Sequence, residues 1–246
     1  MRVRQTVKRF SLISLSLLLP VLAGMHAHAQ TISPIIVEYH EKGAGRILLT
    51  NDTLTPLVVI LQPESFSIAP DGRAIYRPLD PGIHVELSTT SVRLMPRQQY
   101  YVFYKTSADS LPAWYTIYAT FSPAHRGPGL TVRIMLPHTV YLLQKEPLRK
   151  DDVHAGPATW DARKKLVICD VENISKAYGR MREGSVQAGR ESTSIDGFPL
   201  LPGEPRHLEI PWSGKNPPEL LTLHFDHFEL RVPITAGAPA AVASTK

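Results

Sequence analysis

The densest group of side chains that could bind a metal ion is the His-Phe-Asp-His sequence at residues 224–227. Imidazole and carboxylate groups bind zinc, but a site needs three or four of them converging on one point. Along an extended strand His224 and Asp226 lie on one face, while His227 points to the other. No further ligand lies nearby in the sequence. We therefore expect Asp226 and His227 to form the tight turn of a hairpin, and we expect no metal site.

Motifs for enzymatic chemistry are missing from the sequence. It contains no G-x-S-x-G, H-E-x-x-H, P-loop or G-x-G-x-x-G pattern. The glycines in Gly43-Ala44-Gly45 precede an expected strand rather than a helix, which predicts a turn and not a phosphate-binding loop. Cys169 is the only cysteine and lies in an apolar run, where we expect a buried thiol. The sequence thus indicates a protein that is not an enzyme and needs no cofactor.

Aromatic residues are concentrated in two neighbouring expected strands between residues 99 and 121. Such a group could stack against carbohydrate. Alternation along the first strand divides the group, because Tyr101 and Phe103 lie on one face and Tyr100 and Tyr104 on the other. One face of a sandwich strand must be core. Core packing therefore explains most of the set, and a carbohydrate-binding surface is the second interpretation.

A different kind of chemistry, strand pairing, is indicated by residues 130–143. Every second residue at the start of this segment is apolar: Leu130, Val132, Ile134 and Leu136. This spacing places the four side chains on one face of an extended strand. Pro137 has no N–H to donate, which favours the edge of a sheet, and apolar edge strands are normally protected from other chains. We therefore expect this strand either to pair with a partner protein or to line the core of its own domain.

The first thirty residues have the pattern of a secretory signal peptide. Four basic residues precede an apolar stretch at 12–22, and Ala27-His28-Ala29 provides a small-x-small cleavage site. The apolar stretch is shorter than the roughly 20 residues that span a bilayer, so we expect export and no stable membrane insertion. Cleavage before Gln30 would leave 23 of the 27 basic residues against 22 acidic ones, a formal charge of +1. This balance argues against nucleic-acid binding.

Beyond residue 30 the sequence is typical of an all-β protein. Short runs rich in Val, Ile, Leu and Tyr alternate with Pro, Gly, Asn and Asp, and about eight such runs precede residue 143. A polar segment and further runs follow, of which residues 179–197 are expected to be a mobile loop. The expected organisation is a signal peptide at 1–29, a first domain at 30–145, a linker at 146–155, a smaller second domain at 156–235 and a disordered tail at 236–246.

Several short patterns, taken in order, resemble the periplasmic chaperones of chaperone–usher pilus assembly, the PapD-like family. In the first domain these are a strand ending in Asn51-Asp52 and the Leu94-Met95-Pro96 sequence before a Tyr-rich strand. In the second they are Val171-Glu172-Asn173 and the Pro-Leu-Leu-Pro-Gly turn at 199–203. The resemblance covers nearly the whole mature chain. It implies two immunoglobulin-like β-sandwich domains, arranged as a boomerang, in the periplasm.

The resemblance also implies how such a protein would act. In that family the last strand of the first domain is lent to an incomplete pilin subunit, whose groove lacks its own final strand. The matching positions here are Leu130, Val132, Ile134 and Leu136. Each apolar side chain, when fully buried, contributes about 1.5–3 kcal/mol, so that three or four could hold a subunit without ATP. The implied partners are pilin-type subunits and an outer-membrane usher.

One feature of that family is missing from this sequence. The family anchors the terminal carboxylate of the subunit with an Arg on the first strand and a Lys on the last strand. The first expected strand here, residues 35–39, has no Arg, and no Lys occurs before Lys145 at the end of the last one. Arg133 and His138 are the candidates to replace them. The departure implies either a divergent branch or a different client.

The sequence leaves two functions open. The first is an ATP-independent periplasmic chaperone that donates an edge strand to pilus or fimbrial subunits, and it requires a free strand edge within residues 130–143. The second is a secreted two-domain β-sandwich module that binds carbohydrate or an outer-membrane partner through its aromatic surface.

Overall fold

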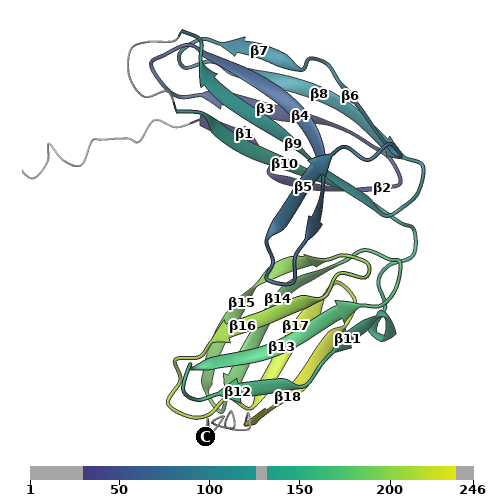
Figure 1. The fold of residues 1–246 in the computed structure, drawn as a ribbon, viewed down its shortest axis with the longest axis vertical. Coiled ribbons are helices and arrows are strands. Elements are labelled where there is room, and N and C mark those ends of the chain that lie inside the picture. The colour runs from purple at the N-terminus through teal and green to yellow at the C-terminus, as the bar shows by residue number, and fades with distance from the viewer. Residues whose placement is uncertain (1–29, 126–131, 237–246) are drawn as a thin grey trace, which may run out of the picture.

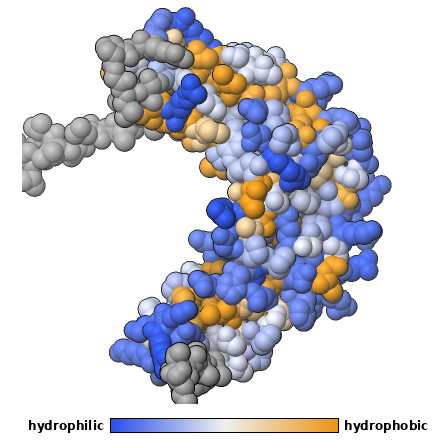
Figure 2. Space-filling model, in the orientation of Figure 1, coloured by the Kyte–Doolittle hydropathy of each residue, from blue (hydrophilic) through white to orange (hydrophobic). Residues whose placement is uncertain are grey.

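The computed structural model describes residues 30–125 and 132–236. Nearly all ordered segments are β-strands, and they form two sandwiches that meet at an elbow (Figure 1). The molecule has a curved outline with a concave side between its two lobes, as Figure 2 shows. The all-β, two-sandwich prediction is confirmed. Among the described residues, no helix is long and apolar enough to cross a membrane.

The first sandwich consists of two sheets. Its strands are β1 (Gln30–Ser33), β2 (Ile36–His40), β3 (Gly43–Asn51), β4 (Leu57–Ile68), β5 (Ala74–Pro78), β6 (Ile83–Leu87), β7 (Ser91–Leu94), β8 (Gln99–Ala108), β9 (Ala113–Pro123) and β10 (Ile134–Leu143). One sheet has the order β1-β3-β8-β6, and the other has the order β2-β10-β9-β4-β5 with β7 beside β4. Strand β10, which carries Ile134, Leu136 and His138 of the residues expected to bind a partner, therefore lies between β9 and β2.

Alternating side chains fill the core between these sheets. In β9 every second residue from Ala113 to Phe121 is buried and packs in one cluster with Val140 and Leu142 of β10 and with the facing sheet. A period of two is what a strand with one face on the core requires. Tyr115, Ile117 and Phe121 thus belong to the core of the first sandwich.

The second sandwich begins earlier than the sequence predicts. Its strands are β11 (Val153–Ala155), β12 (Ala158–Asp161), β13 (Leu166–Asn173), β14 (Gly179–Ala188), β15 (Glu191–Leu200), β16 (Arg206–Pro211), β17 (Leu220–Phe225) and β18 (Glu229–Ala236). Strand β11 pairs with β13 although it lies in the segment expected to be a linker, and Leu148 of that segment is already part of the second core. A 3₁₀ turn at Lys150–Asp152 precedes β11.

Residues 179–197, which were expected to form a mobile loop, instead form the β14–β15 hairpin. The prediction was wrong because it weighed composition over alternation. Buried residues Met181, Val186 and Ala188 line the inner face of β14, and Gly189 provides the positive φ of the turn. The predicted turn at Asp226 and His227 is confirmed, since the N–H of Phe225 donates to the carbonyl of Phe228.

Two buried asparagines form the same corner in the two sandwiches. Asn51 ends β3 and Asn173 ends β13, and both are fully buried. Each Oδ1 accepts from the N–H and hydroxyl of the residue two positions on, Thr53 or Ser175. Each Nδ2 donates to the carbonyl four positions on and to a carbonyl of another strand. These two Asn-x-Ser/Thr sequences are therefore structural corners.

The sandwiches contact each other at the elbow and through the β4–β5 hairpin. An apolar cluster at the elbow joins Phe66 and Tyr141 of the first sandwich to Tyr178 and Leu201 of the second. Further out, the β4–β5 hairpin reaches the second sandwich (Figure 1). There the N–H of Ile68 donates to the Glu204 carboxylate at 2.7 Å, and the N–H of His207 donates to the Pro70 carbonyl at 2.8 Å.

Candidate functional site

Strand β10 has two halves with different neighbours. Its C-terminal half pairs on both sides, with β9 and, in parallel, with β2, where Ile36 lies opposite Thr139 and His40 opposite Leu143. Its N-terminal half, residues 134–138, pairs with β9 alone. Among the described residues β1 passes close to β10, but no strand is hydrogen-bonded to the other side of residues 134–138. We call that side of residues 134–138 the open edge.

The core-facing side chains of β10 are buried at its C-terminal end and become exposed toward its N-terminal end. Val140 and Leu142 are fully buried, Leu136 is half-buried against the core, and Ile134 has 36% of its surface exposed. Val132, just before the strand begins, is 58% exposed. Leu130 lies outside the described residues. Of the four apolar positions singled out in the sequence, three are therefore placed, and they become more exposed toward the N-terminus of the strand.

The backbone of β10 shows which groups are available at the open edge. The N–H of Thr139 donates to the carbonyl of Ile35 at 2.7 Å, so it points toward β2. Backbone groups two residues apart along a strand point the same way. Met135 and Pro137 thus direct their backbone groups to the open edge, and the N–H that Pro137 lacks is not one that β9 requires. A sheet edge of this kind can accept another strand.

His138 has a structural role that the sequence did not reveal. Its side chain is fully buried, with Nδ1 at 2.6 Å from the Pro34 carbonyl and Nε2 at 2.9 Å from the hydroxyl of Tyr104. The Tyr104 hydroxyl lies in turn 2.9 Å from that of Tyr39 on β2. Burial lowers the pKa of His138 from its ordinary value of 6.5, which favours the neutral ring.

The two candidate carboxylate anchors on this strand therefore lie in different surroundings. Both ring nitrogens of His138 already have protein partners, so this side chain has no free group for a carboxylate, and we do not retain it as an anchor. Arg133 is exposed beside the open edge. Because an exposed charge pair is worth little, a contact to Arg133 alone would be a weak anchor.

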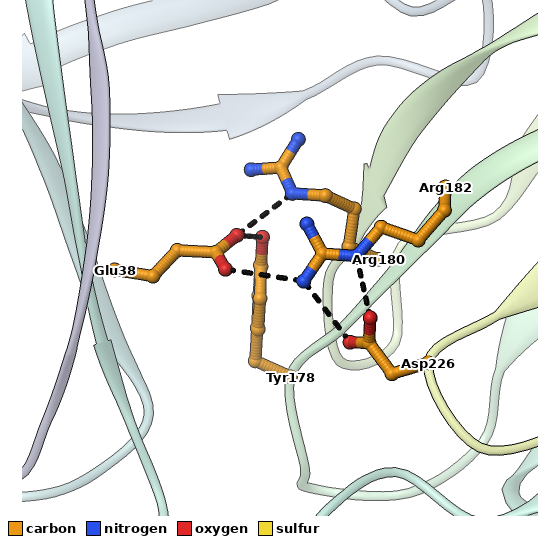
Figure 3. A network of polar contacts seen from close by, with 5 residues as sticks. All are labelled: Glu38, Tyr178, Arg180, Arg182 and Asp226. Carbon is orange, nitrogen blue, oxygen red and sulfur yellow. Dashed lines mark hydrogen bonds and ion pairs between the residues drawn. The ribbon is translucent and has the colours of Figure 1, made fainter. Parts of the chain in front are cut away.

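A charged network lies at the elbow, near the end of β2, as Figure 3 shows. Glu38 accepts hydrogen bonds from Arg180 Nε at 2.8 Å and from the hydroxyl of Tyr178 at 3.2 Å. Arg182 donates to Glu38 at 3.4 Å and makes two contacts to Asp226, of 2.5 and 3.1 Å. Two acidic and two basic groups are thereby paired, and the network joins β2 of the first sandwich to β14 and the β17–β18 turn of the second.

Two tyrosine rings pack against the Arg180 side chain of this network. The Arg180 guanidinium lies over the Tyr141 ring, 5.1 Å from its centroid, and that ring is 4.8 Å from the ring of Tyr178. Burial raises the pKa of both tyrosines, so their hydroxyls stay protonated. A pocket of about 470 Å³ adjoins the network and is lined by Glu38, Arg182, Lys145 and neighbouring residues.

Comparison with solved structures identifies the fold. The YadV chaperone matches with a TM-score of 0.50 at 14% identity, over 80% of this chain and 91% of that one. The class 5 fimbriae chaperone CfaA matches with 0.50 at 9% identity, over 84% and 99%. A Salmonella enterica complex of the SafA pilin with the SafB chaperone matches with 0.51 at 15% identity, over 85% and 97%.

This chain has the fold of the fimbrial chaperones. The matches cover both sandwiches and nearly the full length of the chaperones compared. No protein-family model matches the sequence, and no curated protein matches it by sequence. With identities of 9–15%, the likeness is one of fold.

Within this fimbrial-chaperone fold, strand β2 has an acidic residue, Glu38, at the elbow. Residues 35–39 contain no Arg, and the structure shows that Glu38 pairs there with Arg180 and Arg182 of the second sandwich. The cations at the elbow thus come from β14. This arrangement was not foreseen, because no sequence pattern connects residues that lie 142 positions apart.

The other candidate sites do not gather into a second functional site. Tyr104 and Tyr115 are buried in the core, Tyr101 and Phe103 are exposed on the β3–β8 sheet, and Trp114 is bonded to the Phe66 carbonyl on the other sheet. The aromatic residues therefore form no single platform. Within the described parts of the chain, no three His, Cys, Asp or Glu side chains converge as metal ligands.

Proposed function

We propose that this protein is an ATP-independent periplasmic chaperone that binds pilus or fimbrial subunits by donating the N-terminal half of β10. The observation that carries the proposal is the open edge itself. Residues 134–138 have a partner strand on one side only, and the side chains of Ile134 and Val132 on the core-facing side are exposed. An unpaired backbone edge and an exposed apolar row in one segment are the two features that strand donation needs.

The energetics are compatible with binding that uses no ATP. A guest strand beside β10 would form backbone bonds with Met135 and Pro137, and a groove in the guest would cover Val132, Ile134 and Leu136. Fully burying an exposed apolar side chain contributes about 1.5–3 kcal/mol, and Leu130 would extend the row. Because Leu136 is already partly buried, the exposed Val132 and Ile134 have the most to gain among the described positions.

The partners and the location belong to the same proposal. We assign pilin-type subunits as clients and an outer-membrane usher as the assembly partner, with export to the periplasm through residues 1–29, which lie outside the described residues. The SafB chaperone, one of the structures with the same fold, is seen in complex with a pilin. The separation of the aromatic residues over both sheets and the core disfavours the alternative of a carbohydrate-binding module.

Neighbouring residues on β10 provide a sharp test. Ile134 and Met135 are both exposed but lie on opposite faces of the strand. We propose to co-express the chain with each pilin-type subunit of the same organism and to measure co-purification. Replacement of Ile134 or Val132 with Asp should abolish the complex, because a charge would then enter the apolar groove of the guest.

Met135→Asp is the matched control for this experiment. It adds the same charge one residue away, on the face that the groove would not cover, and should retain most of the complex. Circular dichroism would show that all three variants are folded. A folded Ile134→Asp protein that still captures its subunit as well as the wild type does would contradict the proposal.

A further inference from the structure

The open edge exists because the first strand leaves β10 at a defined point. From Ile36 onward this strand pairs in parallel with β10, in a register that places Ile36 opposite Thr139. Before that point the chain crosses to the other sheet, where Ser33 lies opposite Leu48 of β3. If the strand continued straight along β10, the same register would place Ser33 opposite Leu136. Residues 30–35 would then cover the whole open edge.

Pro137 removes one of the bonds that such a continuation would need. In the observed parallel pairing, the N–H of Thr139 donates to the carbonyl of Ile35. One step further along the ladder, residue 137 would have to donate to the carbonyl of Ser33, and a proline has no N–H. The first strand would have to pass this position before reaching Met135. A guest that bonds to Met135 and to the carbonyl of Pro137 does not need this N–H.

His138 of β10 holds the point at which the chain crosses from one sheet to the other, between β1 and β2. Its Nδ1 lies 2.6 Å from the carbonyl of Pro34, the residue at which the chain leaves β10. The ring is held by Tyr104, which in turn contacts Tyr39 of β2. All these contacts are buried or partly buried, where hydrogen bonds are most strongly favoured over unpaired groups. They tie the crossing point to β10 itself.

Strand β1 has a second possible partner, the N-terminal half of β10. In its observed place β1 pairs with β3 and buries Ile32 beside Leu49. Strand β1 also contacts β10 without pairing with it, and its four extended residues could pair with the N-terminal half of β10 instead of with β3. A short strand with two possible partners can occupy two positions, and small local contacts then decide which of the two is populated.

We infer that Pro137 and His138 act together as a stop that keeps the first strand off the open edge, and that residues 30–35 are a built-in competitor for the same edge. His138 is then a positioning residue: it acts through Pro34 and touches no guest. The competition with a subunit rests on the proposed function, whereas the inference about where the first strand lies does not depend on that function.

The test is hydrogen exchange at the Met135 amide, measured by NMR on the isolated protein. In the wild type this N–H faces the open edge and should exchange rapidly. In Pro137→Ala and in the Pro137→Ala/His138→Leu double variant, the first strand can extend, and the Met135 amide should exchange roughly tenfold more slowly, as expected for one new hydrogen bond. Simple loss of structure would instead leave the Met135 amide exchanging rapidly and would accelerate exchange at Leu136, which pairs with β9.

Pro233→Ala, which changes a proline inside β18 of the other sandwich, is the matched control and should leave Met135 unchanged. Should the double variant fail to fold, Pro137→Ala alone decides the outcome. Exchange at Met135 that stays rapid in the folded variants would overturn the inference. Subunit capture should also slow several-fold in the variants with a protected Met135. If Met135 is protected but subunit capture is unchanged, residues 30–35 do not compete with the subunit for the open edge. Capture of the subunit by the Ile134→Asp variant would instead contradict the proposed function.

Discussion

Glu38 on β2 and Arg180 on β14 form an ion pair with a hydrogen bond of 2.8 Å between the two sandwiches. Only 22% and 12% of their side-chain surfaces are exposed, so this pair is screened far less than a surface pair. Arg182 and Tyr178 complete the contacts of the Glu38 carboxylate. The elbow angle is thus held by charges that are mostly removed from solvent.

Replacing Glu38 with Gln should therefore loosen the elbow. The change leaves Arg180 mostly buried without its counter-charge, at a cost of about 1–3 kcal/mol in the free energy of unfolding. Urea denaturation measures the cost, and small-angle X-ray scattering measures the relative position of the lobes. Glu41→Gln is the control, because the ion pair of Glu41 with Lys145 is exposed and should contribute less than about 0.5 kcal/mol. Equal effects of the two changes would refute this account of the elbow.

The buried asparagine corners should be among the most sensitive polar positions. Asn51→Ala and Asn173→Ala each remove the partners of several buried backbone groups, and we expect each to lower the free energy of unfolding by about 2–4 kcal/mol. Chemical denaturation provides the measurement. Gln187→Ala, an exposed amide on β14, should cost under about 0.5 kcal/mol. Losses of that small size at Asn51 and Asn173 would mean that water replaces the lost bonds.

His138 should make stability depend on pH. Its folded-state pKa is lowered by burial, so below pH 6.5 the unfolded chain binds a proton that the folded chain does not. The free energy of unfolding should accordingly fall as pH decreases from about 6.5 toward the lowered pKa, by up to about 1.4 kcal/mol per unit. Urea titrations between pH 7.5 and 5 measure the slope.

His138→Gln keeps a donor for the Pro34 carbonyl and removes the titrating group. It should flatten this part of the pH profile, whereas a change of the exposed His154 to Gln should leave the slope as it is in the wild type. If the slope persists in a folded His138→Gln protein, another group is responsible for it.

Cys169 should be unreactive in the folded protein. It is 1% exposed, and burial raises the pKa of its thiol to about 11. At pH 8 the thiolate fraction is then about a hundredfold below that of a thiol with a pKa of 9, and access is restricted as well. Iodoacetamide labelling followed by mass spectrometry should show at least this difference in rate between native and urea-unfolded protein. Rapid labelling of the native protein would show that β13 opens readily.

The sequence was most informative where local alternation reflects a long strand with a buried face. The apolar period of two in β9 and β10 predicted their inner faces, and the Asp226–His227 turn followed from two flanking strands. Composition misled at residues 179–197, where Gly, Ser and Arg suggested a loop although buried residues alternate along much of β14. The linker was drawn too long because β11 has only three residues, too few to show a period.

The contacts of the site depended on partners that are distant in the sequence. That residues 134–138 have an open edge follows from where the first strand crosses between sheets, which no local pattern records. His138 appeared to be a free imidazole until Pro34 and Tyr104 were placed beside it. Similarly, the acidic residue at the elbow became intelligible only with Arg180 and Arg182 in place.

The most direct measurement of strand donation is amide exchange along β10 with and without a bound subunit. The backbone groups of Met135 face the open edge, whereas those of Leu136 face β9. Binding of a co-purified pilin-type subunit to the wild-type chain should slow exchange at Met135 by at least about tenfold, with a much smaller change at Leu136, which is already bonded. A stable complex in which the Met135 amide exchanges as fast as in the free protein would contradict strand donation by this edge.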